Sequence, residues 1–146
     1  MNSRILGLDI GDRRIGVALS DITKTIANPL DVVNLGHGTD IFAYLKKIIE
    51  RHDVSAVILG LPKNMDGSIG PQAKKVTDFG EKLKVIFPDK KIDYFDERLS
   101  TRQALRTLIE ADMSRARRKK VVDKVSAVII LQGYLETLNF KRDKKE

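Results

Sequence analysis

The chain opens with residues 5–21, ILGLDIGDRRIGVALSD, which predict its first structural unit. Two apolar runs flank a short polar turn, a pattern typical of a β-hairpin. One carboxylate, Asp9, lies inside the first apolar run. Because an unpaired buried carboxylate is costly, such a group usually pairs with a neighbour or binds a cation. Asp9 is therefore the first candidate for chemistry.

Outward from this hairpin, the sequence predicts strands that alternate with helices. Apolar alternation and β-branched runs predict strands at residues 3–10, 14–20, 26–34, 54–60 and 91–95. Helical spacing predicts helices at residues 39–52, 71–87, 100–112 and 119–139. Thr39 is the expected N-cap of the first helix, and Pro71 suits the first position of the second. The order βββαβαβα indicates an α/β fold with a five-stranded mixed sheet and helices on both faces.

Composition narrows the class of protein. The 146 residues suit one domain, which we place at residues 1–140, followed by a basic C-terminal tail at 141–146. Cysteine is absent, which excludes disulfides and fits a reducing cytoplasm. No signal peptide and no run of roughly 18 apolar residues is evident, so we expect a cytoplasmic protein without membrane contact. The net charge of +7 favours a polyanionic partner such as nucleic acid or anionic lipid, and solubility alone is the equal alternative.

Three carboxylates follow the ends of separate elements. Asp9 ends the first strand, Glu97 follows the last strand, and Asp123 lies in the first turns of the final helix. Together they offer the oxygen ligands that Mg²⁺ or Mn²⁺ prefers, and two such ions about 4 Å apart suit phosphodiester hydrolysis. Each acid also has a structural alternative. Asp9 could bond to turn amides, Glu97 could pair with Arg98 or Arg102, and Asp123 could complement the helix dipole.

Basic and loop residues indicate how a phosphate backbone would be bound. The Gly-rich loop after residue 60 leads into a helix N-terminus, where Lys63 and Asn64 add donors for a phosphate; an ordinary strand–helix loop is the equal alternative. The basic candidates for contact with backbone phosphates are Arg13, Arg14, Arg98, Arg115, Arg118, Lys119 and Lys120. Aromatic residues are few and tryptophan is absent, so we expect recognition of shape and backbone, with base stacking not the main binding mode.

The segments LDIGDRRIGVALSD, GLPKNMDGSIGPQA, FDERLSTRQA and VVDKVSAVIILQGYL resemble the YqgF family, also called RuvX-like, within the RNase H-like superfamily. The resemblance implies an RNase H-like fold and a Mg²⁺- or Mn²⁺-dependent nuclease active on structured nucleic acid. It also implies a role in 5′-end processing of precursor 16S rRNA during ribosome biogenesis. The family's acidic positions match Asp9, Glu97 and Asp123. Related enzymes generally use four acids, and Asp96 and Asp12 are the candidates for the fourth.

Other functions stay open at this point. A Holliday junction resolvase would cut four-way DNA junctions symmetrically and would need a C₂ dimer, whereas the sequence favours a monomer or a weak homodimer. A non-catalytic nucleic-acid-binding factor would retain the basic surface without cleavage. The Asp-Ile-Gly opening also resembles the first phosphate loop of actin-like and sugar-kinase-like ATPases, which need two such domains to close around ATP.

Overall fold

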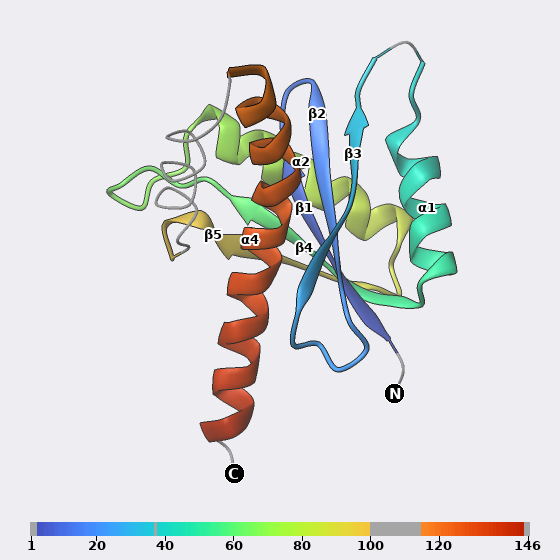
Figure 1. Cartoon of the computed structure of the whole chain (residues 1–146), viewed down its shortest axis with the longest axis vertical. Helices are drawn as coiled ribbons and strands as arrows, with labels where there is room; N and C mark the ends of the chain where they lie inside the picture. Colours follow the sequence, from blue (N-terminus) through green and yellow to red (C-terminus); the bar gives the residue numbers. More distant parts are fainter. Residues whose placement is uncertain (1–2, 37, 100–114, 145–146) are drawn as a thin grey trace.

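The centre of the molecule is a five-stranded mixed sheet with the order β3-β2-β1-β4-β5 (Figure 1). The computed structural model describes residues 3–36, 38–99 and 115–144, with side chains of the last helix described from 125 to 142. The strands are β1 (Arg4–Ile10), β2 (Arg14–Ser20), β3 (Ala27–Asn34), β4 (Val54–Leu61) and β5 (Lys91–Asp96). The first three pair antiparallel, and β4 pairs parallel with both β1 and β5. The predicted fold class and strands are confirmed.

Helices cover both faces of this sheet. Helices α1 (Ile41–Arg51) and α2 (Pro71–Ile86) pack on one face, while α4 (Arg115–Lys144) crosses the other (Figure 1). The short 3₁₀ helix η1 (Glu97–Leu99) follows β5. Because both faces of the sheet are covered, β1 and β4 carry apolar side chains on both sides, which explains their continuous apolar runs. The predicted helix at 100–112 lies outside the described residues.

The alternation along each strand assigns residues to a face. In β1, Leu6 and Leu8 pack against α1 and α2, whereas Ile5 packs against α4. Gly7 also faces α4, because a Cβ on Gly7 would lie 2.7 Å from the Cβ of Leu131. A side chain at position 7 would therefore force α4 away from the sheet.

The start of α1 differs from the prediction. The N-cap is Asp40 rather than Thr39, since the Asp40 carboxylate accepts hydrogen bonds from the amides of Phe42 and Ala43, each at 3.1 Å. The Thr39 hydroxyl donates instead to the Gly36 carbonyl at 2.8 Å. Threonine and aspartate both cap helices well, and the N-cap here is Asp40, the residue directly before the buried Ile41. Pro71 is confirmed as the first residue of α2.

The last helix begins earlier than predicted. Helix α4 starts at Arg115 rather than near residue 119, so the basic run forms its first turns, and it continues to Lys144. Arginine and lysine are good helix formers, so the run needs no apolar period to be helical. The domain boundary at 140 stays a prediction, although the helix runs through the first residues of the expected tail.

Polar contacts fix α4 along the sheet. The Gln132 side chain accepts a hydrogen bond from the Ala27 amide at 2.9 Å and donates one to the Thr25 carbonyl at 3.0 Å. Seven residues on, Asn139 donates to the Lys24 carbonyl at 3.1 Å. These contacts tie one row of the helix to the turn between β2 and β3. In the described part of the chain, no helix is long and apolar enough to cross a bilayer.

Candidate functional site

A pocket of about 380 Å³ lies where the carboxyl ends of β1, β4 and β5 meet. Ligand sites of open α/β sheets gather at such edges. The residues that line it are Asp9, Ile10, Gly11, Asp12, Gly60, Pro62, Gln72 and Glu97. The structure thus brings together two of the three predicted acids: Asp9 from the central strand β1 and Glu97 from η1, which follows the edge strand β5.

Both acids belong to the sheet face that α4 covers. The alternation along β1 places Asp9 on the same side as Ile5 and Gly7. In β4, Gly60 shares this side with Ile58, and a Cβ on Gly60 would lie 2.6 Å from Oε1 of Glu97. The same Cβ would collide with the side chain of Ile130 in α4. Glu97 therefore occupies space left by the missing side chain of Gly60.

The third predicted acid, Asp123, lies on the backbone of α4, and its side chain is outside the described side chains. Asp123 precedes Ala127 by four residues and Ile130 by seven, and both of these are fully buried against the sheet. The spacing places position 123 on the same row of the helix, about two turns before Ile130. The helix dipole acts on charges in the first turn of a helix. Because α4 begins at Arg115, position 123 lies beyond that turn, and the dipole does not explain an acid there.

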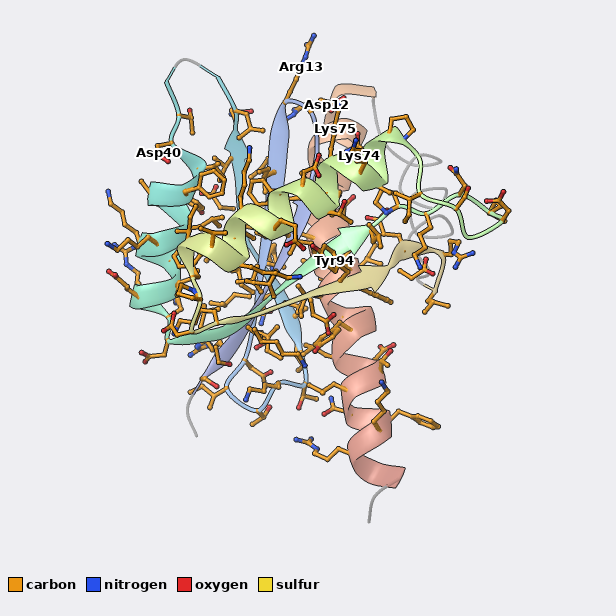
Figure 2. The ribbon with its side chains drawn as sticks, turned by 180° about the vertical axis from the view of Figure 1, so that it is seen from behind. Asp12, Arg13, Asp40, Lys74, Lys75 and Tyr94 are labelled. Atoms are coloured by element: carbon orange, nitrogen blue, oxygen red, sulfur yellow. The ribbon has the colours of Figure 1, made fainter. Side chains whose placement is uncertain are left out.

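Of the two candidates for a fourth acid, Asp12 lines the pocket with Asp9 and Glu97. Its carboxylate pairs with Nζ of Lys75 at 2.8 Å (Figure 2). Asp96 is not among the lining residues. The Arg98 guanidinium and amide bond to the Asp96 carboxylate at 2.6–3.0 Å, and this arginine holds the pKa of Asp96 below its ordinary value. Asp12 is the better placed of the two.

The donor set fits a hard divalent cation in part. Asp9 and Glu97 supply carboxylate oxygens on one open pocket, which is the ligand type for Mg²⁺ and Mn²⁺. Among the residues whose side chains are described, no three metal-ligating groups converge. The third predicted acid, at position 123, has its side chain outside that set and lies on the helix whose Ile130 packs beside Gly60 and Glu97.

A basic rim adjoins the pocket. Arg13 extends from the tip of the β1–β2 hairpin into solvent, and Lys74 and Lys75 lie beside the hairpin on α2 (Figure 2). Sequence reasoning missed both lysines, because about sixty positions separate them from the hairpin and no motif links the two segments. It also missed Gln72, whose side-chain amide donates to the Ile10 carbonyl at 3.0 Å and ties α2 to β1.

The other predicted contacts lie around this rim or beyond it. Arg14 lies at the start of β2, where its carbonyl accepts a hydrogen bond from Gly11 at 2.9 Å. The side-chain amide of Asn64 donates to Ser68 Oγ at 2.9 Å, so this donor serves the loop itself. Arg115, Arg118, Lys119 and Lys120 fall in the first turns of α4, outside the described side chains.

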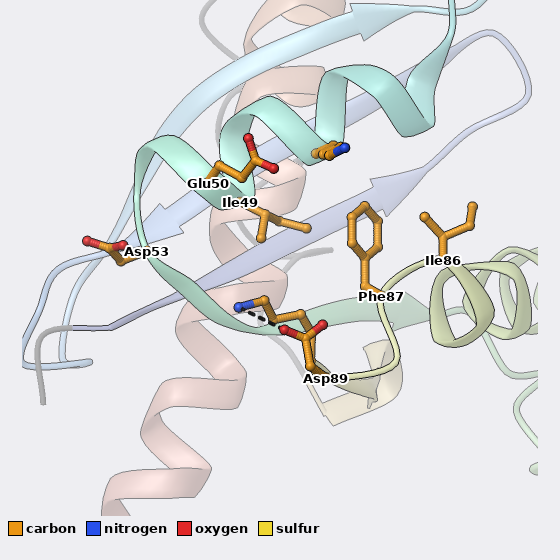
Figure 3. Close-up of a pocket in the computed structure, with 8 residues that line it drawn as sticks. Ile49, Glu50, Asp53, Ile86, Phe87 and Asp89 are labelled. Carbon is orange, nitrogen blue, oxygen red and sulfur yellow. Dashed lines mark ion pairs between the residues drawn. The ribbon is translucent and has the colours of Figure 1, made fainter.

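A second pocket, of about 500 Å³, lies between the C-terminal ends of α1 and α2 (Figure 3). It is lined by Lys46, Ile49, Glu50, Asp53, Ile86, Phe87, Asp89 and Lys90. None of these residues is a predicted site residue. Asp89 pairs with Lys90 at 3.7 Å, and the remaining charges are mixed in sign. The larger pocket therefore offers no concentrated acidic site, and the chemistry points to the smaller one.

The strand order and the helices on both faces give this chain an RNase H-like fold, with an acidic pocket at one edge of the sheet. The fold is shared with T. thermophilus RuvC in complex with a Holliday junction substrate, at a TM-score of 0.55 and 13% identity over 92% of this chain and 94% of the other. The yeast mitochondrial Holliday junction resolvase Ydc2 matches at a TM-score of 0.55 and 12% identity, over 92% of this chain and 78% of the other. At these identities the likeness concerns the fold alone.

Sequence comparison identifies the family. Residues 3–137 match the family RuvX, described as Holliday junction resolvase, and the chain belongs to this family. A relative from Caldanaerobacter subterraneus subsp. tengcongensis is 49% identical over 135 residues, covering 92% of this chain and 96% of the relative. A second, from Thermoanaerobacter pseudethanolicus, is 50% identical over the same shares. Each is named "Putative pre-16S rRNA nuclease". The chain is thus a nuclease, a hydrolase acting on nucleic acids.

Proposed function

We propose that this chain is a Mg²⁺- or Mn²⁺-dependent nuclease that processes the 5′ end of precursor 16S rRNA. The observation that carries the proposal is the pocket shared by Asp9 and Glu97 at the carboxyl edge of the sheet. The names of its relatives supply the RNA substrate. The protein would act in the cytoplasm, where ribosomes are assembled.

Asp9, Glu97 and Asp123 would hold the divalent cation through carboxylate oxygens. When bound, such a cation polarises the phosphodiester and activates water for its hydrolysis. Asp12 lines the same pocket and pairs with Lys75, and it would be the fourth acid near the cation. Gly60 leaves the room that the Glu97 carboxylate needs.

The basic residues would bind the phosphate backbone outside this pocket. Arg13, Arg14 and Lys74 border the hairpin and the start of α2. Arg115, Arg118, Lys119 and Lys120 would extend the basic surface along the first turns of α4. Binding through phosphates makes the affinity fall steeply with salt. Asn64 and Arg98 would position the loop of residues 62–70 beside the substrate, since both bond within or to that loop.

A second candidate function is resolution of four-way DNA junctions, which the family description favours. Symmetric resolution places two active sites on one junction and requires a C₂ dimer. Processing of a single RNA strand needs one copy, in keeping with a monomer or a weak homodimer.

The test compares cleavage of labelled precursor 16S rRNA with cleavage of a synthetic four-way DNA junction, each with Mg²⁺ and with Mn²⁺. Wild type is assayed beside Asp9→Asn and a matched control, Asp78→Asn, which changes an exposed carboxylate on α2. RNA cleavage lost only in Asp9→Asn supports the proposal. Symmetric junction cleavage would favour the resolvase. Binding of RNA without cleavage by the wild type would make the chain a non-catalytic factor.

A further inference from the structure

The most exposed large apolar side chain in the described part of the chain is Met65, at 92%. It lies in the loop of residues 62–70 that joins β4 to α2. This loop begins at the acidic pocket, because Pro62 lines the pocket with Asp9 and Glu97. It projects from the body of the protein near η1 (Figure 1). Two further large apolar residues are exposed: Ile69 in the same loop and Leu99 in η1.

The loop is held in one shape by its own hydrogen bonds. The Asn64 amide donates to the Ser68 carbonyl at 3.0 Å, and Gly67 returns a bond to the Asn64 carbonyl at 2.8 Å. Gly67 has a φ of +89°, a conformation that favours glycine and closes the turn. Arg98 donates to the Met65 carbonyl at 3.4 Å and joins the loop to the end of β5. The backbone around Met65 is therefore preorganised, so binding through this side chain costs little backbone conformational entropy.

Charge indicates which part of a nucleic acid this tip would meet. Asp66 adjoins Met65, and hydrogen bonds from the side chain and amide of Ser68 lower its pKa, so its carboxylate is ionised. An ionised carboxylate repels backbone phosphates. An apolar thioether beside it gains by packing on the flat face of a base. The tip thus suits bases, whereas the basic residues around the pocket suit phosphates.

We propose that Met65 is a wedge that packs against an unstacked base next to the bond that is cut. Apolar side chains of this type enter base steps in other nucleic-acid complexes and hold them open. The substrate class that fits is nucleic acid with an unpaired or easily unstacked nucleotide beside the scissile phosphate, rather than a continuous duplex. This inference rests on the proposed function, since it needs a nucleic acid at the pocket.

The experiment places 2-aminopurine, whose fluorescence rises when it unstacks, at each nucleotide flanking the cleavage site of precursor 16S RNA in turn. Binding is measured without a divalent cation for wild type, Met65→Ala and Met65→Leu. The matched control is Val85→Ala, because Val85 is 80% exposed on the last turn of α2, away from the pocket. Thermal unfolding checks that each variant keeps the fold.

We expect a fluorescence rise at one flanking nucleotide for wild type, Val85→Ala and Met65→Leu. For Met65→Ala we expect the rise to vanish and the affinity to fall on the order of two- to tenfold. An unchanged fluorescence rise in Met65→Ala would overturn the wedge. Asp9→Asn separates the two proposals, because it should abolish cleavage while the fluorescence rise stays. If wild type binds no RNA, the proposed function and the wedge both fail.

Discussion

Oε1 of Glu97 lies where a side chain of Gly60 would otherwise stand, since a Cβ on Gly60 would approach this oxygen to 2.6 Å. Gly60 is on β4 and Glu97 follows β5, two strands that pair in parallel with Gly60 opposite Phe95. The position of the proposed catalytic carboxylate therefore depends on a hydrogen atom at position 60. The side chain of Ile130 in α4 also requires glycine at position 60, because a Cβ there would collide with its Cδ1 atom.

Gly60→Ala should disturb both packing and chemistry. Overpacking against Ile130 and Glu97 is expected to lower the free energy of unfolding by about 1–3 kcal/mol, and displacement of Glu97 should lower nuclease activity severely. Urea unfolding and RNA cleavage measure the two effects. Gly80→Ala is the matched control, because its Cβ would collide with Tyr94 away from the acids. Equal relative activity in the two folded variants would contradict the role given to Gly60.

Lys75→Met and Asp12→Asn should change cation affinity in opposite directions. The pair is exposed, at 61% and 65%, so its loss should alter the free energy of unfolding by less than about 1 kcal/mol. Without Lys75, the Asp12 carboxylate loses a competing positive charge, and Mn²⁺ should bind several-fold more tightly. Without the Asp12 charge, Mn²⁺ should bind more weakly.

Calorimetric titration with Mn²⁺ and no nucleic acid measures this affinity directly. Lys82→Met provides the control, since Lys82 is an exposed lysine seven residues further along α2. A shift of the same sign in Lys75→Met and Asp12→Asn would show that Asp12 does not act at the cation site.

Gln132→Ala should destabilise the protein without touching the pocket. The change leaves the buried Ala27 amide and the Thr25 carbonyl without their side-chain partner. An unsatisfied buried group costs about 1–3 kcal/mol, and denaturant unfolding measures that loss. Glu136→Ala, an exposed change one turn along the same helix, should stay within about 0.5 kcal/mol of wild type. Matching values for the two variants would refute the anchoring role.

The turn after β2 should make stability depend on acid pH. Hydrogen bonds from the Ile26 amide, the Thr23 hydroxyl and the Thr25 amide lower the pKa of Asp21 from 3.8 to about 2. Since the pKa is lower in the folded state, the ionised form stabilises the fold above the unfolded pKa, and this contribution is lost as pH falls toward 2. Asp21→Asn should therefore melt below wild type at neutral pH, and the difference should shrink between about pH 4 and pH 2.

Melting curves at several pH values test this expectation. Asp89→Asn is a suitable control, because Asp89 lies in the loop before β5 and pairs only loosely with Lys90, at 3.7 Å. A gap between wild type and Asp21→Asn that stays constant down to pH 2 would be inconsistent with the hydrogen bonds described.

The sequence predicted the strands well, because each carries a local signature. The β-branched run of β4 and the apolar residues around Asp9 are local patterns produced by burial in the sheet. The strands that they predict are also those that the family resemblance implies. The predicted start of α4 was wrong, because a run of arginines and lysines contains no apolar periodicity from which a helix could be predicted. Their intrinsic helix propensity nevertheless allows the helix to begin at Arg115. Threonine and aspartate are both good N-cap residues, so the sequence alone does not decide between Thr39 and Asp40. In the structure α1 begins at Ile41, which makes Asp40 the N-cap.

The site was predictable in kind and less so in detail. Asp9 and Glu97 stood out as carboxylates at strand ends, a local property, and they do share a pocket. Gln72 and Lys75 contact the hairpin through pairings across more than sixty residues, which no motif announces. The side-chain amide of Asn64 bonds within its own loop, a contact that depends on the turn at Gly67.

The contacts of Gln132 have one further consequence, for how this chain can change in length. They set the rotation of α4 about its own axis, and Asp123 is nine residues, or two and a half turns, before them. One residue inserted between these two positions would turn the proposed ligand by about 100° around the helix and move it about 1.5 Å along it. The spacing between positions 123 and 132 therefore cannot change by a single residue without displacing the proposed ligand from the pocket.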